Sequence, residues 1–293
     1  MKTAIDPGAG FCFGVKRAIQ LAEEKLADGK EFFSLGQIVH NKEEEIRLNK
    51  LGMSTIDQSR LDELHNSRIL LRAHGEPPET YLKARQQGLE VTDATCKVVL
   101  KLQEKVKKLW LDREKDDRQI VIVGKNNHPE VIGLAGNAGN QAIVVETISD
   151  LEQVDTTRPV YLFAQTTADE DIFEEVKTEI EIRLKQQNSA PGSKLFITNS
   201  ICSHVRNRKK QIVDFALKHD LIIFVGDKNS SNSRYLFNLC QKINTNSFFV
   251  ENESMIREEW LNSQNSIGIT GATSTPIWLL KKIEHKINPL KKD

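Results

Sequence analysis

The 293-residue sequence has little of several features that would each point to a class of protein. It contains only four cysteines and no CxxC pair, so the usual signature of a clustered zinc site is missing. No apolar run approaches the roughly 18 residues that a membrane span needs, and we expect no membrane partner. The formal net charge is +0 at pH 7, so nothing in the totals favours nucleic acid or an anionic membrane surface.

The first residues also lack the apolar core of a signal peptide and lead directly into the first cysteine motif. We therefore expect a cytoplasmic protein, in which thiols stay reduced. In that compartment the four cysteines are expected to be metal ligands, catalytic groups or core residues rather than disulfides. The length allows two or three domains with a large combined core.

Three of the cysteines occupy the same kind of position, directly before a run with apolar residues at helical spacing. Cys12 precedes 15–26, Cys96 precedes 98–109, and Cys202 precedes 205–217. The unpaired N–H groups at the start of a helix stabilise an anion such as a thiolate. The fourth, Cys240, lies on an amphipathic helical run and is interpreted as a core residue.

The segments that follow these three cysteines repeat one order of elements. A helix-like run leads to an unbroken apolar strand that ends in glycine, and Gly36, Gly124 and Gly226 follow their cysteines by 24, 28 and 24 residues. Such strands are typical of buried parallel sheets with helices on both faces. The repeat predicts three α/β units at 13–96, 97–198 and 199–281, the third completed by 1–12, with 282–293 as a basic, exposed tail.

The three cysteines at equivalent corners favour one metal centre over three inert thiols. Ligands of open α/β sheets bind at the carboxyl ends of the strands, where all these loops lie. Iron–sulfur clusters are held by thiolates, and three thiolates on a four-iron cluster leave one iron open as a Lewis acid.

Polar side chains that can bind a phosphate also follow the apolar strands. The set is His40, His74, His128, Ser230, Ser231, Asn232 and Ser274. All of them offer hydrogen-bond donors suited to phosphate oxygens. Glu130 is either a proton relay beside the open iron or an acid favoured at a helix start. Thr166 either extends that relay or caps the helix expected at 169–184.

With these residues in place, the sequence resembles the 4-hydroxy-3-methylbut-2-enyl diphosphate reductases, iron–sulfur enzymes of the methylerythritol phosphate route to isoprenoids, over essentially its whole length. The shared motifs are Gly10-Phe11-Cys12-Phe13-Gly14-Val15, Val39-His40-Asn41, Ala73-His74-Gly75, Asp93-Ala94-Thr95-Cys96, His128-Pro129-Glu130-Val131, Gln165-Thr166-Thr167, Ile201-Cys202, Asn207-Arg208, Asn229-Ser230-Ser231-Asn232-Ser233 and Ser274-Thr275-Pro276.

The resemblance implies an α/β trefoil of three pseudo-threefold-related units around a central cavity. It implies that Cys12, Cys96 and Cys202 hold a 4Fe–4S cluster whose open iron takes the substrate hydroxyl. His40, His74, Ser230, Asn232 and Ser274 would bind the diphosphate, with His128 and Ser231 close by. Glu130 would deliver protons and Thr166 would bond the substrate oxygen, with His128 beside them.

The implied reaction removes the hydroxyl as water with two electrons and two protons, giving isopentenyl and dimethylallyl diphosphate. The implied partner is a ferredoxin or flavodoxin, and a monomer is expected. Some positions depart from the common pattern, notably Lys97 where many relatives have proline and Ser203-His204-Val205-Arg206 after the third cysteine. An iron–sulfur hydro-lyase acting on a small phosphorylated substrate, and an iron–sulfur sensor or phosphate-binding protein, remain alternatives.

Overall fold

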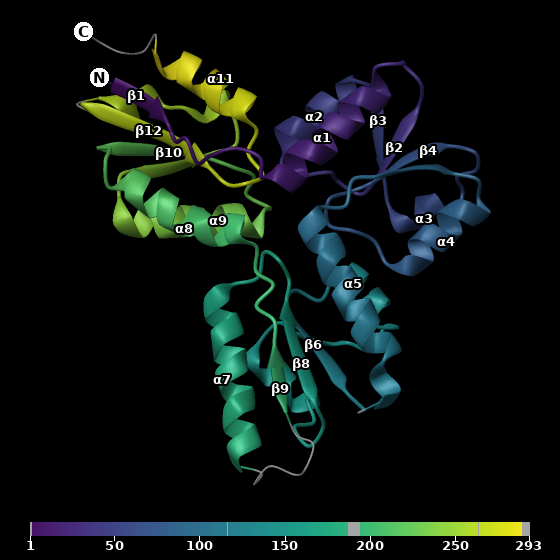
Figure 1. The fold of residues 1–293 in the computed structure, drawn as a ribbon. Coiled ribbons are helices and arrows are strands. Elements are labelled where there is room, and N and C mark those ends of the chain that lie inside the picture. The colour runs from purple at the N-terminus through teal and green to yellow at the C-terminus, as the bar shows by residue number, and fades with distance from the viewer. Residues whose placement is uncertain (1, 116, 187–193, 263, 289–293) are drawn as a thin grey trace. The chain divides into compact units, whose positions relative to one another are not determined.

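The computed structural model describes residues 2–115, 117–186, 194–262 and 264–288 (Figure 1). The chain divides into two compact units. Unit 1 combines both chain ends, Met1–Leu61 and His204–Asp293, and unit 2 is the continuous segment Asp62–Ser203. None of the helices in the described part of the chain has the length and apolar character needed to cross a bilayer.

Unit 1 contains the first and last elements of the chain. They are β1 (Lys2–Ile5), α1 (Phe13–Leu26), β2 (Phe32–Leu35), α2 (Lys42–Lys50), β3 (Met53–Ile56), α3 (Gln58–Leu61), α8 (Ser203–Ala216), β10 (Leu221–Val225), α9 (Ser231–Ile243), β11 (Ser247–Val250), η3 (Glu253–Met255), α10 (Glu258–Leu261), β12 (Ser266–Gly271) and α11 (Ile277–Ile287). Helix α8 starts at the unit boundary.

Unit 2 contains the middle elements. They are β4 (Arg68–Leu71), α4 (Pro78–Gln86), β5 (Glu90–Asp93), α5 (Lys97–Leu111), η1 (Arg113–Lys115), β6 (Gln119–Val123), α6 (Pro129–Asn137), β7 (Ile143–Val145), η2 (Ile148–Gln153), β8 (Val160–Ala164), α7 (Glu170–Gln186) and β9 (Leu195–Ile197).

The strands form three four-stranded sheets, and every strand pairing described is parallel. Unit 1 holds the sheet β1-β12-β10-β11, and unit 2 holds the sheet β7-β6-β8-β9. In addition, β2 pairs with β3 within unit 1, and β4 pairs with β5 within unit 2. The predicted fold class, α/β with parallel sheets in three sets, is confirmed.

Helices cover both faces of the β7-β6-β8-β9 sheet. On β6, Val121 and Val123 pack with the buried residues of α7, whereas Ile120 and Ile122 pack with those of α5 and α6. Figure 1 shows α5 and α7 on opposite sides of this sheet. Because successive strand residues point to opposite faces, a strand covered on both sides must be apolar throughout.

The β1-β12-β10-β11 sheet of unit 1 is built in the same way. Ile223 and Val225 of β10 pack with α11, and Ile222 and Phe224 pack with α8 and α9. Cys240 is fully buried in the second of these clusters, which confirms its interpretation as a core residue.

The expectation of an exposed tail at 282–293 is wrong for its first residues. Helix α11 continues through Ile287, and both Ile283 and Ile287 are fully buried. These residues extend the apolar spacing of Leu279 and Leu280, and their burial outweighs the lysines between them. Residues 289–293 lie outside the described part of the chain, and the predicted three-unit boundaries stay a prediction.

Candidate functional site

The three cysteines proposed as ligands lie where the sequence predicted, at the starts of helices. Cys12 and Cys96 have extended backbones and immediately precede α1 and α5, and their side chains make no capping hydrogen bond. Cys202 immediately precedes α8. All three are half-buried thiols outside any disulfide.

The backbone N–H of each cysteine donates a hydrogen bond to a carbonyl in a neighbouring loop. Cys12 donates to the carbonyl of Thr273 at 3.2 Å, Cys96 to that of Ala73 at 3.0 Å, and Cys202 to that of Thr166 at 2.8 Å. The loops that carry the three sulfurs are therefore positioned by backbone hydrogen bonds.

A half-buried carboxylate, Asp93, shapes the turn that carries Cys96. Asp93 Oδ1 accepts hydrogen bonds from the N–H of Thr95 at 2.8 Å and from its hydroxyl at 2.5 Å. Asp93 Oδ2 accepts one from the Tyr81 hydroxyl at 3.0 Å. Burial raises the pKa of Tyr81, so the phenol remains a proton donor to Asp93.

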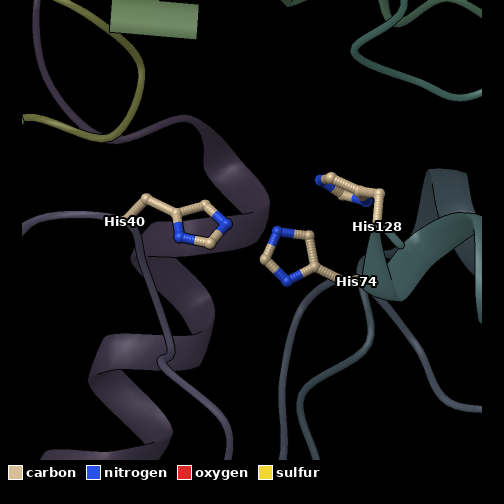
Figure 2. A group of neighbouring side chains, drawn as sticks. All are labelled: His40, His74 and His128. Carbon is tan, nitrogen blue, oxygen red and sulfur yellow. The ribbon is translucent and has the colours of Figure 1, made fainter. Parts of the chain in front are cut away.

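His74 and His128 lie together in unit 2. Their ring centroids are 5.2 Å apart and the rings are nearly perpendicular, at 85° (Figure 2). His128 Nδ1 also accepts a hydrogen bond from the Glu130 N–H at 3.1 Å, so it caps the start of α6. That bond places the proton of a neutral imidazole on Nε2, where it can be donated to a phosphate oxygen. The capping role was not predicted.

Glu130 is a buried carboxyl held by Thr166. Its Oε1 accepts from the Thr166 N–H at 2.6 Å, and its Oε2 accepts from the Thr166 hydroxyl at 2.7 Å. Burial raises the pKa of Glu130 to about 7, against the opposing effect of the two Thr166 hydrogen bonds. A carboxyl with that pKa can both hold and release a proton near neutral pH.

Unit 2 thus connects most of its predicted site residues through one chain of contacts. The Ala73 carbonyl, one residue before His74, holds Cys96; His74 contacts His128; His128 caps Glu130; Glu130 binds Thr166; and the Thr166 carbonyl holds Cys202. The Thr166 hydroxyl bonds Glu130 rather than the start of α7, and its part in a proton relay stays a prediction.

A second group of predicted residues lies in unit 1. Asn232 Nδ2 donates to Thr273 Oγ1 at 3.3 Å, and the Thr273 carbonyl accepts from Cys12. Beside Thr273, the buried hydroxyl of Ser274 has no hydrogen-bond partner in the part of the chain that is described. A buried orphan donor of this kind fits an absent polar ligand.

Ser230 and His40 belong to the same unit. The Ser230 hydroxyl caps α9 by accepting from the Ser233 N–H at 3.3 Å. His40 Nδ1 lies 3.4 Å from Gln37 Oε1. Asp227, just before Ser230, accepts from the Lys42 N–H at 3.1 Å, which ties the His40 loop to the start of α9. The Ser231 side chain lies outside those described.

A fully buried ion pair, not predicted from the sequence, supports the loop that carries Ser274. Arg208 lies 2.7 Å from Asp6 and donates to the Gly271 carbonyl at 2.8 Å and to Thr270 Oγ1 at 2.6 Å. Thr270 Oγ1 in turn donates to Asp6 at 2.7 Å. The only sequence signal was the presence of Arg208 in a shared motif, which gave no role.

Comparison with known proteins gives a consistent result along the whole chain. The model of the LytB protein family matches residues 4–288. The 4-hydroxy-3-methylbut-2-enyl diphosphate reductase of Bacteroides thetaiotaomicron is 45% identical over 293 residues and covers 100% of both chains. The protein of the same name from Chlorobium limicola is 39% identical, with 98% of each chain covered.

Solved structures are similar over nearly the same length. A structure of (E)-4-hydroxy-3-methyl-but-2-enyl diphosphate reductase aligns with a TM-score of 0.75 at 35% identity, covering 99% of this chain and 100% of that chain. The structure of E-1-hydroxy-2-methyl-but-2-enyl-4-diphosphate reductase from Plasmodium falciparum aligns with a TM-score of 0.80 at 26% identity, covering 97% and 86%.

Proposed function

We propose, since this chain belongs to the LytB protein family, that it reduces (E)-4-hydroxy-3-methylbut-2-enyl diphosphate to isopentenyl and dimethylallyl diphosphate. The reaction consumes two electrons and two protons and releases the hydroxyl as water. The observation that carries the proposal is Glu130, a buried acid with a pKa of about 7 held by Thr166, whose carbonyl anchors Cys202.

The donor set fits a 4Fe–4S cluster held by Cys12, Cys96 and Cys202. Each sulfur is half-buried at a helix start, where backbone N–H groups stabilise a thiolate. Iron–sulfur clusters take thiolate ligands, and three ligands leave one iron open. When bound, the cluster would supply electrons and a Lewis-acidic iron for the substrate oxygen.

The remaining residues bind substrate and deliver protons. Glu130 donates the protons, and Thr166 bonds both Glu130 and the substrate oxygen. His40, His74, His128, Ser230, Ser231, Asn232 and Ser274 bind the diphosphate. The Nε2–H of His128 and the orphan hydroxyl of Ser274 support this assignment, because both can donate to phosphate oxygens. We place the enzyme in the cytoplasm as a monomer supplied with electrons by a ferredoxin or flavodoxin.

An anaerobic assay with the allylic diphosphate tests the proposal. Product formation should require dithionite or a reduced carrier protein, because the reaction consumes electrons. A hydro-lyase would act without reductant, and a sensor or phosphate-binding protein would not turn over in either condition. Either of those results would reject the reductase.

Replacement of Cys96 by serine tests cluster ligation. Serine is a favoured residue at a helix start, so Cys96→Ser should keep α5 and the fold. Iron content and visible absorbance should fall together with activity, while far-UV circular dichroism stays unchanged. Cys240→Ser is the matched control and should keep the cluster, since Cys240 is a core residue. A Cys96→Ser protein with full iron and activity would contradict the assignment.

A further inference from the structure

Helix α5, which starts directly after Cys96, carries an unusual charge. It contains five lysines and one acidic residue, Glu104, in a chain whose formal net charge is +0. Lys97, Lys101, Lys105 and Lys108 recur at spacings of four, four and three residues, so they lie on one stripe of the helix. All four are exposed. Glu104 lies on the same stripe, three residues after Lys101 and four before Lys108, so the four lysines and this glutamate leave the stripe a net charge of 4 − 1 = +3.

An apolar side chain borders this stripe on edge strand β9. Phe196 is 42% exposed and stacks on Tyr161 with ring centroids 4.5 Å apart. The Arg118 guanidinium lies over the same Tyr161 ring, 5.0 Å from its centroid. Lys105 Nζ donates to Thr198 Oγ1 at 2.8 Å, which joins the stripe to the end of β9. We call these residues (Lys97, Lys101, Lys105, Lys108, Arg118 and Phe196) the lysine face.

The other side of the same sheet carries the opposite charge. Helix α7 has six acidic residues and three basic ones, and it packs on the face away from α5. The helices on the two faces of this sheet in unit 2 therefore carry opposite net charges, positive on α5 and negative on α7. An acidic protein is attracted to the lysine face and repelled from the α7 side, which orients it before contact.

The lysine face also lies beside two of the proposed cluster ligands. Lys97 follows Cys96 in the chain, and Thr198 at the end of β9 precedes Cys202 by four residues. The face combines a basic rim with an apolar contact, as small transient protein interfaces do.

We propose that the lysine face is the docking surface for a small acidic one-electron carrier protein. This inference rests on the proposed function, because only a reductase needs such a partner. Each encounter oxidises one reduced carrier by one electron, and two encounters provide the two electrons that remove the hydroxyl as water.

The test uses the reconstituted enzyme with Lys101→Glu and Lys108→Glu combined, which leaves Lys97 beside Cys96 and the Lys105–Thr198 bond intact. At both positions the new carboxylate lies three or four residues from Lys105, which offsets its repulsion from Glu104, so α5 should remain folded. Reduced flavodoxin is the probe, and Lys185→Glu on α7 is the matched control, exposed on the opposite side of the sheet.

With flavodoxin at low salt, kcat/KM of the double variant should fall by about tenfold or more, since charge at an interface mainly changes the association rate. The dependence of kcat/KM on salt concentration should become weaker, and calorimetric titration with oxidised flavodoxin should show weaker binding. Turnover driven by dithionite and methyl viologen should stay unchanged, and Lys185→Glu should behave as the wild type.

Unchanged flavodoxin kinetics and binding in the double variant would overturn the docking surface, and so would an equal loss in Lys185→Glu. If dithionite drives no turnover in the wild type, the proposed function fails instead, and the calorimetric titration still decides whether an acidic carrier binds the lysine face.

Discussion

Glu130 is fully buried, and the N–H and hydroxyl of Thr166 donate hydrogen bonds to its two carboxyl oxygens. Its pKa in the folded protein, about 7, lies above the usual 4.5, so the folded protein binds this proton more tightly than the unfolded chain does. The resulting stability is present below pH 4.5 and is lost as the pH rises towards 7. At neutral pH the burial of this carboxyl therefore lowers the free energy of unfolding.

At this scale we expect kcat/KM to fall above about pH 7 as Glu130 loses its proton. Thr166→Val removes the hydroxyl that favours the ionised form, so the fall should move to higher pH, whereas Thr166→Ser should keep the wild-type profile. Anaerobic pH–rate profiles measure both. A profile for Thr166→Val that moves to lower pH would contradict this coupling.

Glu130→Gln should lower kcat by about 10²–10⁴-fold while diphosphate binding is retained, because only the proton donor is lost. The unfolding free energy of the Glu130→Gln protein should increase relative to that of the wild type as the pH rises from 5 to 8, since glutamine cannot ionise. Loss of binding together with normal turnover would make Glu130 a structural residue. Isothermal titration and denaturant unfolding provide the two measurements.

Candidate site residues could be proposed from the sequence where residue type alone indicates chemistry. Thiols, imidazoles and a carboxyl after apolar strands pointed to a metal and a phosphate. The partners were not predictable, because they depend on distant contacts. Nothing in the sequence around Tyr81 shows that its hydroxyl binds Asp93, and nothing local shows that His128 caps α6.

At the scale of elements, the turn before α5 is held by side chains rather than by the helix itself. Asp93 accepts two hydrogen bonds from Thr95, and the Cys96 N–H extends the β4–β5 pairing beyond the strands by bonding Ala73. The position of the Cys96 sulfur is therefore fixed before the first turn of the helix begins.

Thr95→Val should loosen this turn, since it removes a hydrogen bond to a charged group worth about 1.5–3 kcal/mol. We expect faster hydrogen exchange of the amides at 95–97 and faster loss of the proposed cluster to a chelator, with the helix content unchanged. Thr95→Ser is the control. Exchange that is no faster in Thr95→Val would show that the backbone pairing alone positions Cys96.

The buried central strands β6 and β10 were predicted from the sequence, whereas the edge strands β1, β7 and β11 were not, for one physical reason. β6 and β10 are buried along their whole length, so each reads as an unbroken apolar run. β1, β7 and β11 lie at sheet edges with only three or four residues and mixed burial. So short a segment carries no readable period.

At the scale of the whole molecule, segments from the beginning and the end of this sequence pair with each other within unit 1. β1 pairs with β12 from Lys2↔Ser266 to Ile5↔Ile269, and Asp6 forms its buried ion pair with Arg208. A buried pair adds little to stability by itself, but breaking it leaves an uncompensated charge.

Asp6→Asn or Arg208→Met alone should therefore lower the unfolding free energy by about 3–5 kcal/mol, and the double variant should recover part of the loss. Anaerobic denaturant unfolding measures these values. Additive losses in the double variant would mean that the two side chains act independently.

Because unit 1 is made of two separate segments, it also sets the order in which parts of the protein can fold during synthesis. Unit 2 is one uninterrupted segment and is complete when residue 203 leaves the ribosome, but β1 has to wait for its pairing partner β12, which begins at Ser266. Cys12, whose N–H donates to the Thr273 carbonyl, reaches its folded position only after residue 273 has been translated. The proposed cluster would then be assembled only after residue 273 has been translated, because Cys12 is one of its three proposed ligands.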